Sequence, residues 1–271
     1  MEPVRRIFRF AWRAGSFSNG ERAIPEEVAV AFTYNGMSYA VMMATPQDLE
    51  DFACGFSLTE GIIASVKEIE QLEVIESDLG IELRMWLVAN RGSAFTERKR
   101  HLAGPTGCGL CGLETLSDAM RPPPVVTSEI SLHPDEIMHA IDALAPAQVI
   151  NHETRAVHAA AFWRPGVGMA AVREDVGRHN ALDKLAGALA RDQVSAHEGF
   201  LIFTSRVSVE MVQKAAMMGA SVIAAISAPT TLAVRTAHAA GITLAAVARK
   251  DGFEVFTHTQ RIKSRESAYV A

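Results

Sequence analysis

The C-terminal half of the chain alternates short apolar runs with helix-type patterns, and this alternation constrains the fold more than any other feature. Residues 201–203 and 222–226 are apolar without interruption, which is typical of strands that helices cover on both faces. Because strand–helix–strand units cross over with a right-handed sense, the carboxyl ends of parallel strands meet at one edge of a sheet. We therefore predict an α/β sandwich whose ligands bind at that edge. The predicted strands are 157–163, 168–172, 200–204, 222–227, 242–248 and 253–257, and the predicted helices are 134–144, 181–190, 208–218 and 231–240.

The N-terminal half predicts a smaller α+β unit. Two β-prone runs at 28–34 and 38–44 flank Asn35-Gly36, a pair that favours a tight hairpin turn. A helix is then predicted to begin with Thr45 as its cap. Cys54 falls inside that helix, where we expect a small packed residue. Further strands are predicted at 72–75 and 81–89.

A run of three prolines, Pro122-Pro123-Pro124, marks the best candidate for a domain boundary. Proline cannot occupy the interior of a helix or of a central strand. We therefore predict an N-terminal α+β domain over residues 1–124 and a C-terminal α/β domain over residues 125–271.

Two of the three cysteines, Cys108 and Cys111, are separated by two residues, with glycine on both sides of Cys108 and directly after Cys111. Glycine leaves a neighbouring sulfur accessible, whereas a structural cysteine usually sits among large apolar side chains. The basic run 98–101 precedes the pair, and nearby positive charge favours the nucleophilic thiolate. The pattern predicts reactive sulfur in a C-x-x-C loop carried by the N-terminal domain.

Composition narrows the classes of partner. A net charge of −5 over 271 residues argues against a general binder of nucleic acid or of a membrane surface. No uninterrupted apolar segment approaches the roughly 20 residues that cross a bilayer, so we expect a cytoplasmic protein. In a reducing compartment the C-x-x-C pair is a redox dithiol, half of a metal site or a sulfur carrier.

Three loops are predicted at the carboxyl edge of the sheet, at 204–208, 227–231 and 248–252. Their hydroxyl groups, cations and following helix N-termini suit a phosphate-bearing ligand of nucleotide size. The first loop contributes Ser205 and Arg206 as candidate contacts. A fourth loop, at 173–180, is either a second contact or a structural element in which Asn180 caps the next helix and Asp175 pairs locally with Arg178.

Four blocks in this order resemble the formate dehydrogenase accessory sulfurtransferases. The likeness covers roughly residues 27–262, and its blocks are 106–112 (TGCGLCG), 174–184 (EDVGRHNALDK), 205–214 (SRVSVEMVQK) and 230–234 (TTLAV). The resemblance implies transfer of sulfur, as a cysteine persulfide, from a cysteine desulfurase. The acceptor would be the molybdenum (or tungsten) bis(molybdopterin guanine dinucleotide) cofactor of formate dehydrogenase.

The resemblance also implies roles for particular residues. Cys108 would carry the persulfide, and Cys111 would assist it or relay the sulfur. The guanine-dinucleotide contact would fall on the stretch Val247, Ala248, Arg249, Lys250, Asp251 and Gly252. A homodimer and a C-terminal α/β/α sandwich of the cytidine deaminase type are implied as well. Deaminases hold zinc partly through a C-x-x-C at a helix start, whereas residues 205–208 contain no thiol, so we expect no permanently bound metal.

Two other interpretations of the cysteine pair come from different classes of protein. A thiol–disulfide redox pair lacks the usual position directly after the first strand of a βαβ unit. Half of a zinc site lacks a second C-x-x-C or a pair of clustered histidines. Mass spectrometry separates these interpretations, because a persulfide, a disulfide and bound zinc change the mass differently.

Overall fold

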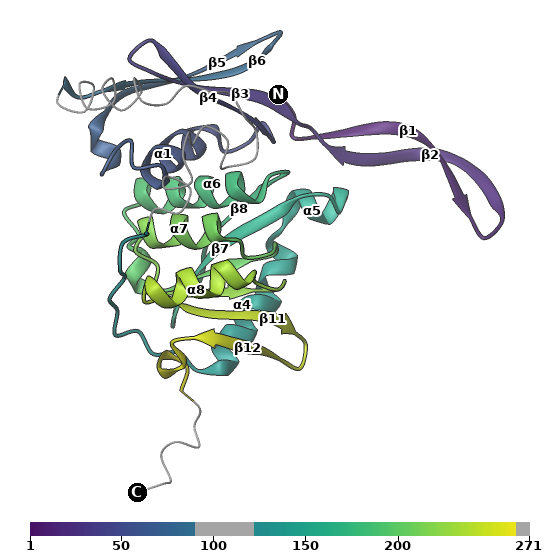
Figure 1. Cartoon of the computed structure of the whole chain (residues 1–271). Helices are drawn as coiled ribbons and strands as arrows, with labels where there is room; N and C mark the ends of the chain where they lie inside the picture. Colours follow the sequence, from purple (N-terminus) through teal and green to yellow (C-terminus); the bar gives the residue numbers. More distant parts are fainter. Residues whose placement is uncertain (90–121, 264–271) are drawn as a thin grey trace, which may run out of the picture.

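The computed structural model describes residues 1–89 and 122–263, and these residues form three β-sheets (Figure 1). The largest sheet has six strands in the order β12-β11-β10-β9-β7-β8. Strands β9, β10 and β11 are parallel, whereas β7 is antiparallel to both β8 and β9, and β12 is antiparallel to β11. The strand bounds are β7 His158–Arg164, β8 Gly168–Asp175, β9 Phe200–Phe203, β10 Val222–Ala225, β11 Thr243–Arg249 and β12 Gly252–Thr257.

Helices cover both faces of this sheet, as the uninterrupted apolar strands predict. Helices α6, α7 and α8 pack on one face, and α4 packs on the other (Figure 1). In β9, Leu201 and Phe203 face the first group of helices, while Phe200 and Ile202 face α4. The mixed α/β architecture is therefore confirmed. The helix bounds are α4 Pro134–Ala147, α5 Val149–Thr154, α6 Arg178–Arg191, α7 Val209–Met217 and α8 Thr231–Ala239.

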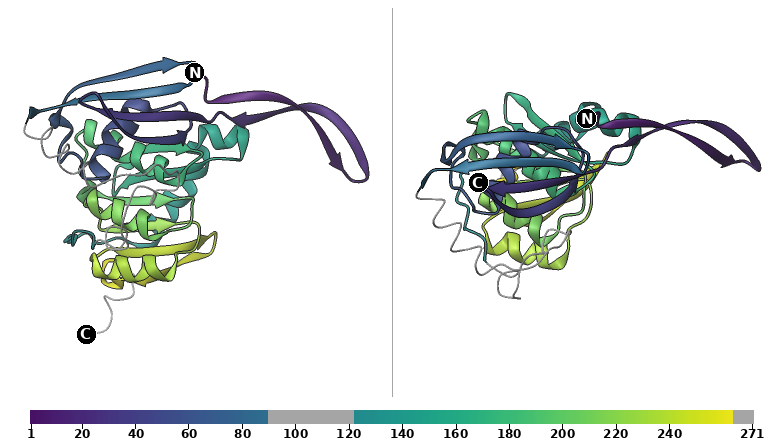
Figure 2. Two further views of the ribbon diagram at one scale, coloured as in Figure 1. Left: turned by 45° about the horizontal axis from the view of Figure 1, so that its top comes forward. Right: turned by 90° about the horizontal axis from the view of Figure 1, so that it is seen from above.

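A second sheet of four strands, in the order β4-β3-β6-β5, lies beyond the β8 end of the large sheet (Figures 1 and 2). Helix α1, Leu49–Thr59, covers its inner face. The ring of Phe32 on β3 lies 4.2 Å from Phe56 and 4.9 Å from Phe52, measured between centroids. This aromatic cluster is the core of the N-terminal unit. The strand bounds are β3 Val28–Tyr34, β4 Met37–Ala44, β5 Ile69–Ser77 and β6 Gly80–Leu87.

Helices α1 and α6 join the two units by crossing at two glycines. A Cβ atom built on Gly55 would lie 1.7 Å from the carbonyl oxygen of Asp183, and one built on Gly187 would lie 1.9 Å from that of Asp51. The two helix backbones are therefore in direct contact, at a separation that only glycine permits. The α6 side of α1 and its aromatic side are thus both buried.

The third sheet is a two-stranded arm, β1 Val4–Arg13 and β2 Ser16–Pro25, which projects away from the body (Figure 2). Neither these strands nor the short helix α5 is predicted from the sequence. Phe8, Phe10 and Trp12 alternate with Arg9, Ala11 and Arg13, and this period of two is a sequence signal that could have indicated β1.

Two predicted helix caps are wrong. Helix α1 begins after Asp48, which has a left-handed φ of 55°, and its proposed cap Thr45 is instead fully buried beside α6. Helix α6 begins after Gly177, and Asn180 lies within its first turn. Both polar side chains bind partners from the other unit, which local sequence patterns cannot reveal.

Cys54 is packed inside α1, as predicted, with 6% of its surface exposed. The hairpin turn at Asn35-Gly36 is also confirmed, since both residues have the positive φ that this turn requires. The domain boundary near residue 125 stays a prediction, and the C-x-x-C loop lies outside the described residues.

The glycine contact predicts a large effect of one added methyl group. Gly55→Ala forces a Cβ atom against the backbone of α6, so we expect the free energy of unfolding to fall by about 3 kcal/mol. Urea denaturation measures this change. Gly20→Ala is the matched control, because the nearest atom to its Cβ would be 4.0 Å away. Equal stability of the two variants would contradict the backbone contact.

Candidate functional site

The carboxyl ends of β8, β9, β10 and β11 lie along one edge of the large sheet, because these four strands run in the same direction. Main-chain hydrogen bonds connect the loops that follow β9, β10 and β11. The N–H of Val207 donates to the carbonyl of Ala228 (3.3 Å), and the N–H of Thr230 donates to the carbonyl of Val207 (3.0 Å). The N–H of Val247 donates to the carbonyl of Ser227 (3.2 Å). The three predicted loops are therefore neighbours.

The loop after β9 carries two of the predicted contacts. Ser205 is 3% exposed, and its Oγ donates to the carbonyl of Arg206 at 3.1 Å. The side chain of Arg206 is exposed. Ser208 is the residue before α7, yet its Oγ makes no capping hydrogen bond and is buried without a partner. Of these three residues, Arg206 and Ser208 have polar groups still available to a ligand.

The end of β11 carries the other predicted contacts. Val247 has a left-handed φ of 56° beside an irregularity in the pairing with β12, and Ala248 is buried. Arg249 Nη1 donates to the carbonyls of Ile226 (2.6 Å) and Ala248 (2.7 Å), so this guanidinium also holds the end of β10. The side chains that face solvent here belong to Arg249, Lys250 and Asp251, with Gly252 completing the turn at a φ of 150°.

A buried polar cluster lies between the first turns of α6 and α7. His179 Nε2 and Glu210 Oε2 are 3.9 Å apart, and each side chain is 13% exposed. Four atoms of this region are buried without a hydrogen-bond partner: Arg178 Nε, His179 Nε2, Ser208 Oγ and Glu210 Oε2. Buried polar atoms are nearly always paired in folded proteins. Four orphaned atoms at adjacent helix starts are typical of a ligand-binding or catalytic site.

The imidazole of His179 is held in its neutral form. Burial, with the positive charges of Arg178 and Lys214, lowers the pKa of His179 to about 4. At neutral pH its ring nitrogens therefore comprise one donor and one acceptor. The sequence placed His179 in a candidate contact loop, but nothing in the sequence indicated that Glu210 faces it.

The loop after β8 is fixed by a fully buried ion pair rather than by local pairing of Asp175 with Arg178. Lys184 Nζ lies 2.7 Å from Asp175 Oδ2, and both side chains are 0% exposed. The same Nζ donates to the carbonyl of Thr45, whose own N–H donates to Asp175. Asn180 Nδ2 donates to Asp175 and to the carbonyl of Met43. This network connects the site edge to the small sheet.

A second buried network lies one helical turn further along α6 and α7 than the pair His179 and Glu210. Lys214 Nζ contacts Asp183 Oδ1 and Glu60 Oε1, both at 2.9 Å, and also donates to Thr59. Burial alone lowers the pKa of Lys214, but the two carboxylates outweigh it and raise the pKa above its ordinary value. Lys214 is therefore a permanent cation that holds α1 against α6 and α7.

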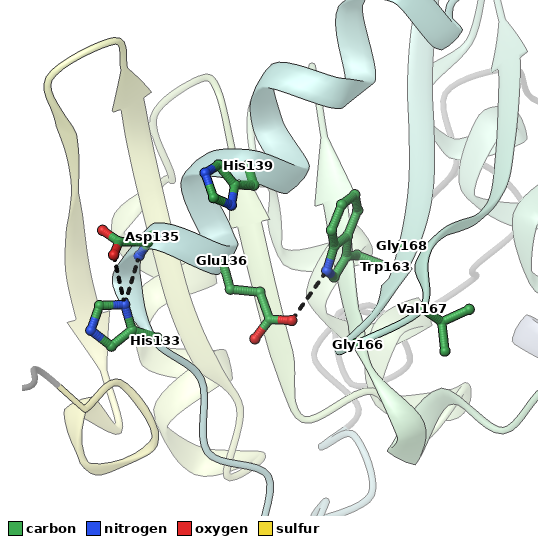
Figure 3. A pocket seen from close by; sticks show the side chains of 8 residues that line it. All are labelled: His133, Asp135, Glu136, His139, Trp163, Gly166, Val167 and Gly168. Carbon is green, nitrogen blue, oxygen red and sulfur yellow. Dashed lines mark hydrogen bonds and ion pairs between the residues drawn. The ribbon is translucent and has the colours of Figure 1, made fainter.

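A surface hollow of about 520 Å³ lies elsewhere, between the start of α4 and the β7–β8 turn (Figure 3). Glu136 accepts a hydrogen bond from Trp163 Nε1 at 3.5 Å, and His133 pairs with Asp135. Because β7 runs opposite to β9, this hollow lies at the other edge of the sheet. It contains none of the predicted site residues. Among residues 1–89 and 122–263, no group of three or more His, Cys, Asp or Glu side chains could hold a metal ion.

The predicted sulfur-carrying residues, Cys108 and Cys111, lie outside the described residues. The model of the FdhD/NarQ family matches residues 25–263. The chain belongs to the FdhD/NarQ family.

Curated FdhD/NarQ relatives match along almost their whole length. The sulfur carrier protein FdhD of Agrobacterium fabrum is 54% identical over 259 residues, which cover 95% of this chain and 96% of that relative. The protein of the same name from Cupriavidus necator is 47% identical over 256 residues, covering 94% and 89%. These matches confirm the family resemblance that the four sequence blocks indicate.

The fold has a counterpart among solved structures. A crystal structure from Desulfotalea psychrophila, of a protein assigned as a formate dehydrogenase accessory protein, superposes with a TM-score of 0.75. It is 24% identical and covers 97% of this chain and 100% of its own. At this identity the comparison supports the FdhD/NarQ fold alone.

Within the described ranges, the longest and most apolar helices still fall short of what a membrane crossing requires.

The lowered pKa of His179 predicts a specific dependence of stability on pH. The unfolded chain takes up a proton at His179 near the ordinary pKa of 6.5, whereas the folded chain does so only near 4. Stability that is present above pH 6.5 is therefore lost as the pH falls toward 4. When the pH falls from 7 to 5, the free energy of unfolding of the His179→Gln variant should decrease by about 2 kcal/mol less than that of the wild type.

Urea denaturation at the two pH values measures this difference. His139→Gln, at an exposed position on α4, is the control and should follow the wild type. Identical pH slopes for the wild type and His179→Gln would show that His179 titrates normally.

Proposed function

We propose that the protein is a sulfurtransferase that carries sulfur as a persulfide on Cys108. The sulfur comes from a cysteine desulfurase and goes to the molybdenum bis(molybdopterin guanine dinucleotide) cofactor that formate dehydrogenase requires. The observation that carries this proposal is the near-full-length match, at 54% and 47% identity, to relatives named sulfur carrier protein FdhD. The glycine-flanked pair Cys108 and Cys111 supplies the thiols that such a carrier needs.

The chemistry requires an accessible thiolate. The Cys108 thiolate attacks the terminal sulfur of the donor's persulfide, a new S–S bond forms, and the donor's cysteine thiolate leaves. Cys54 is unsuited to this step, because it is buried and burial raises its pKa to about 11. Of the three cysteines, the pair at 108 and 111 is left as the reactive one.

The carboxyl edge of the large sheet suits the anionic part of the acceptor. A guanine dinucleotide presents a diphosphate, which helix N-termini and exposed cations bind well. The starts of α7 and α8 lie at this edge, together with Arg206, Arg249 and Lys250. The orphaned polar atoms around Ser208 and Glu210 offer further hydrogen bonds. On this proposal the contacts comprise Ser205, Arg206 and the stretch from Val247 to Gly252.

Three further parts of the proposal come from the family resemblance. The C-terminal sandwich is of the cytidine deaminase type, with the zinc-binding thiols of that fold replaced in the loop that contains Ser205 and Ser208. The protein works in the cytoplasm. It forms a homodimer.

The persulfide is tested by mass spectrometry after incubation with a cysteine desulfurase and cysteine. The wild type should gain about 32 Da, the mass of one sulfur atom, at the 108–111 peptide. Cys108→Ala should abolish both this gain and the maturation of formate dehydrogenase. Cys54→Ala is the control and should be loaded normally. A loss of about 2 Da instead would indicate a disulfide, and loading of Cys108→Ala at the wild-type level would refute the proposal.

The nucleotide edge is tested by titration with GDP. Arg249→Ala/Lys250→Ala should weaken GDP binding by about tenfold or more, because two cations near the phosphates are lost. Arg164→Ala/Lys67→Ala removes the same charge away from this edge and should leave the affinity unchanged.

The single substitution Lys250→Glu distinguishes an effect on GDP binding from an effect on stability. Lys250→Glu spares the hydrogen bonds that Arg249 makes to Ile226 and Ala248, and it should weaken GDP binding without lowering the melting temperature. Unchanged affinity in both edge variants would place the nucleotide elsewhere.

A further inference from the structure

The arm formed by β1 and β2 has two chemically different faces. Paired residues of an antiparallel ladder point to the same side, and the register pairs Phe8 with Glu21, Phe10 with Asn19 and Trp12 with Phe17. One face therefore carries all four aromatic side chains of the arm. The opposite face carries Arg5, Arg9, Arg13 and Arg22.

The aromatic face is largely uncovered. The exposed fractions are 60% for Phe8, 68% for Phe10, 60% for Trp12 and 73% for Phe17. The rings contact one another, with centroids 5.4 Å apart for Phe8 and Phe10 and 4.9 Å apart for Trp12 and Phe17. Contiguous apolar surface of this kind marks an interaction site on a soluble protein.

Among the described residues, the arm has no covering layer beyond its base, where β2 packs against α5. At that base Arg22 donates to the carbonyl of Thr154, and Arg5 pairs with Glu26. Within the described residues, the arm forms a sheet of two strands alone (Figure 2). An isolated two-stranded hairpin is at best marginally stable in water. A partner that covers the aromatic face would stabilise it.

The distribution of charge on the two faces of the arm favours a second copy of this chain as the partner of the aromatic face. Residues 4–25 contain five arginines and one glutamate, whereas the whole chain has a net charge of −5. The basic face would repel a copy of itself. The aromatic face carries one cation, Arg6, and one anion, Glu21, so two copies related by a two-fold axis can pair the rings and offset the charges.

We propose that the aromatic face of the arm is the contact through which two copies of this chain form a dimer. Each aromatic side chain buries roughly 150–250 Å² when covered, so the exposed parts amount to about 500 Å² per arm. Two arms together approach the roughly 1,000 Å² that a specific interface requires. This assignment rests on the homodimer of the proposed function, to which it gives a surface, and does not depend on sulfur transfer.

Sedimentation velocity over a range of concentrations tests the dimer. The wild type should be dimeric, and Phe10→Ser/Trp12→Ser should weaken self-association by about 100-fold or more. Val167→Ser/Met217→Ser, which changes two exposed apolar side chains of the body, is the matched control and should remain dimeric. If the wild type stays monomeric at about 100 µM, the proposal is overturned, and the partner of the aromatic face is then another protein or a lipid surface.

Cross-linking tests the face itself, even if the serine variants unfold the arm. In a Cys108→Ala/Cys111→Ala background, Asn19→Cys on the aromatic face should form covalent dimers with a short bismaleimide. Ser18→Cys, its neighbour on the basic face, should form few. Equal cross-linking at the two positions, or a dimer that Phe10→Ser/Trp12→Ser does not weaken, overturns the proposal.

Discussion

The direct backbone contact between α1 and α6 is the constraint on which the rest of the structure depends. Gly55 and Gly187 allow the two helices to approach until backbone atoms touch, and this brings the loop before α1 against the start of α6. Thr45 can then reach Asp175 and Lys184 with its main chain. The edge of the large sheet is thus held by groups from both sheets, and the small sheet becomes part of the support of the site.

The buried ions around this contact position the site more than they stabilise the fold. Removing a lysine or a carboxylate from water costs several kcal/mol, and its attraction to a buried partner offsets that cost only partly. Each partner nevertheless has few positions in which its charge is satisfied. Lys184 orients the loop after β8, and Lys214 ties α1 to α6 and α7. The orphaned atoms of His179 and Glu210 lie directly beside these rigid networks, so their own positions are defined.

Most of the sandwich was predictable from the chain, because its strands are apolar without alternation and its helices have clear apolar stripes. The predicted strands and helices from 134 to 257 agree with β7 to β12 and with α4, α6, α7 and α8 to within a few residues. The two wrong caps, Thr45 and Asn180, share one cause. A threonine or asparagine before a helix suits a local cap, but here each side chain binds the main chain of a distant segment. Thr45 Oγ1 accepts from the N–H of Val176, and Asn180 Nδ2 donates to the carbonyl of Met43.

The sequence by itself determined the family, the class of fold and the edge at which the candidate contacts gather, since each follows from motifs, periodicity or the direction of parallel strands. Only the tertiary structure decided that His179 faces Glu210, that Asp175 pairs with Lys184, and that the aromatic rings of the arm share one exposed face. These features depend on contacts between residues far apart in the chain or on strand register. The spacing of Phe8, Phe10 and Trp12 puts these three rings on one side of a strand, but the pairing that adds Phe17 and the exposure of the face are set by register and packing.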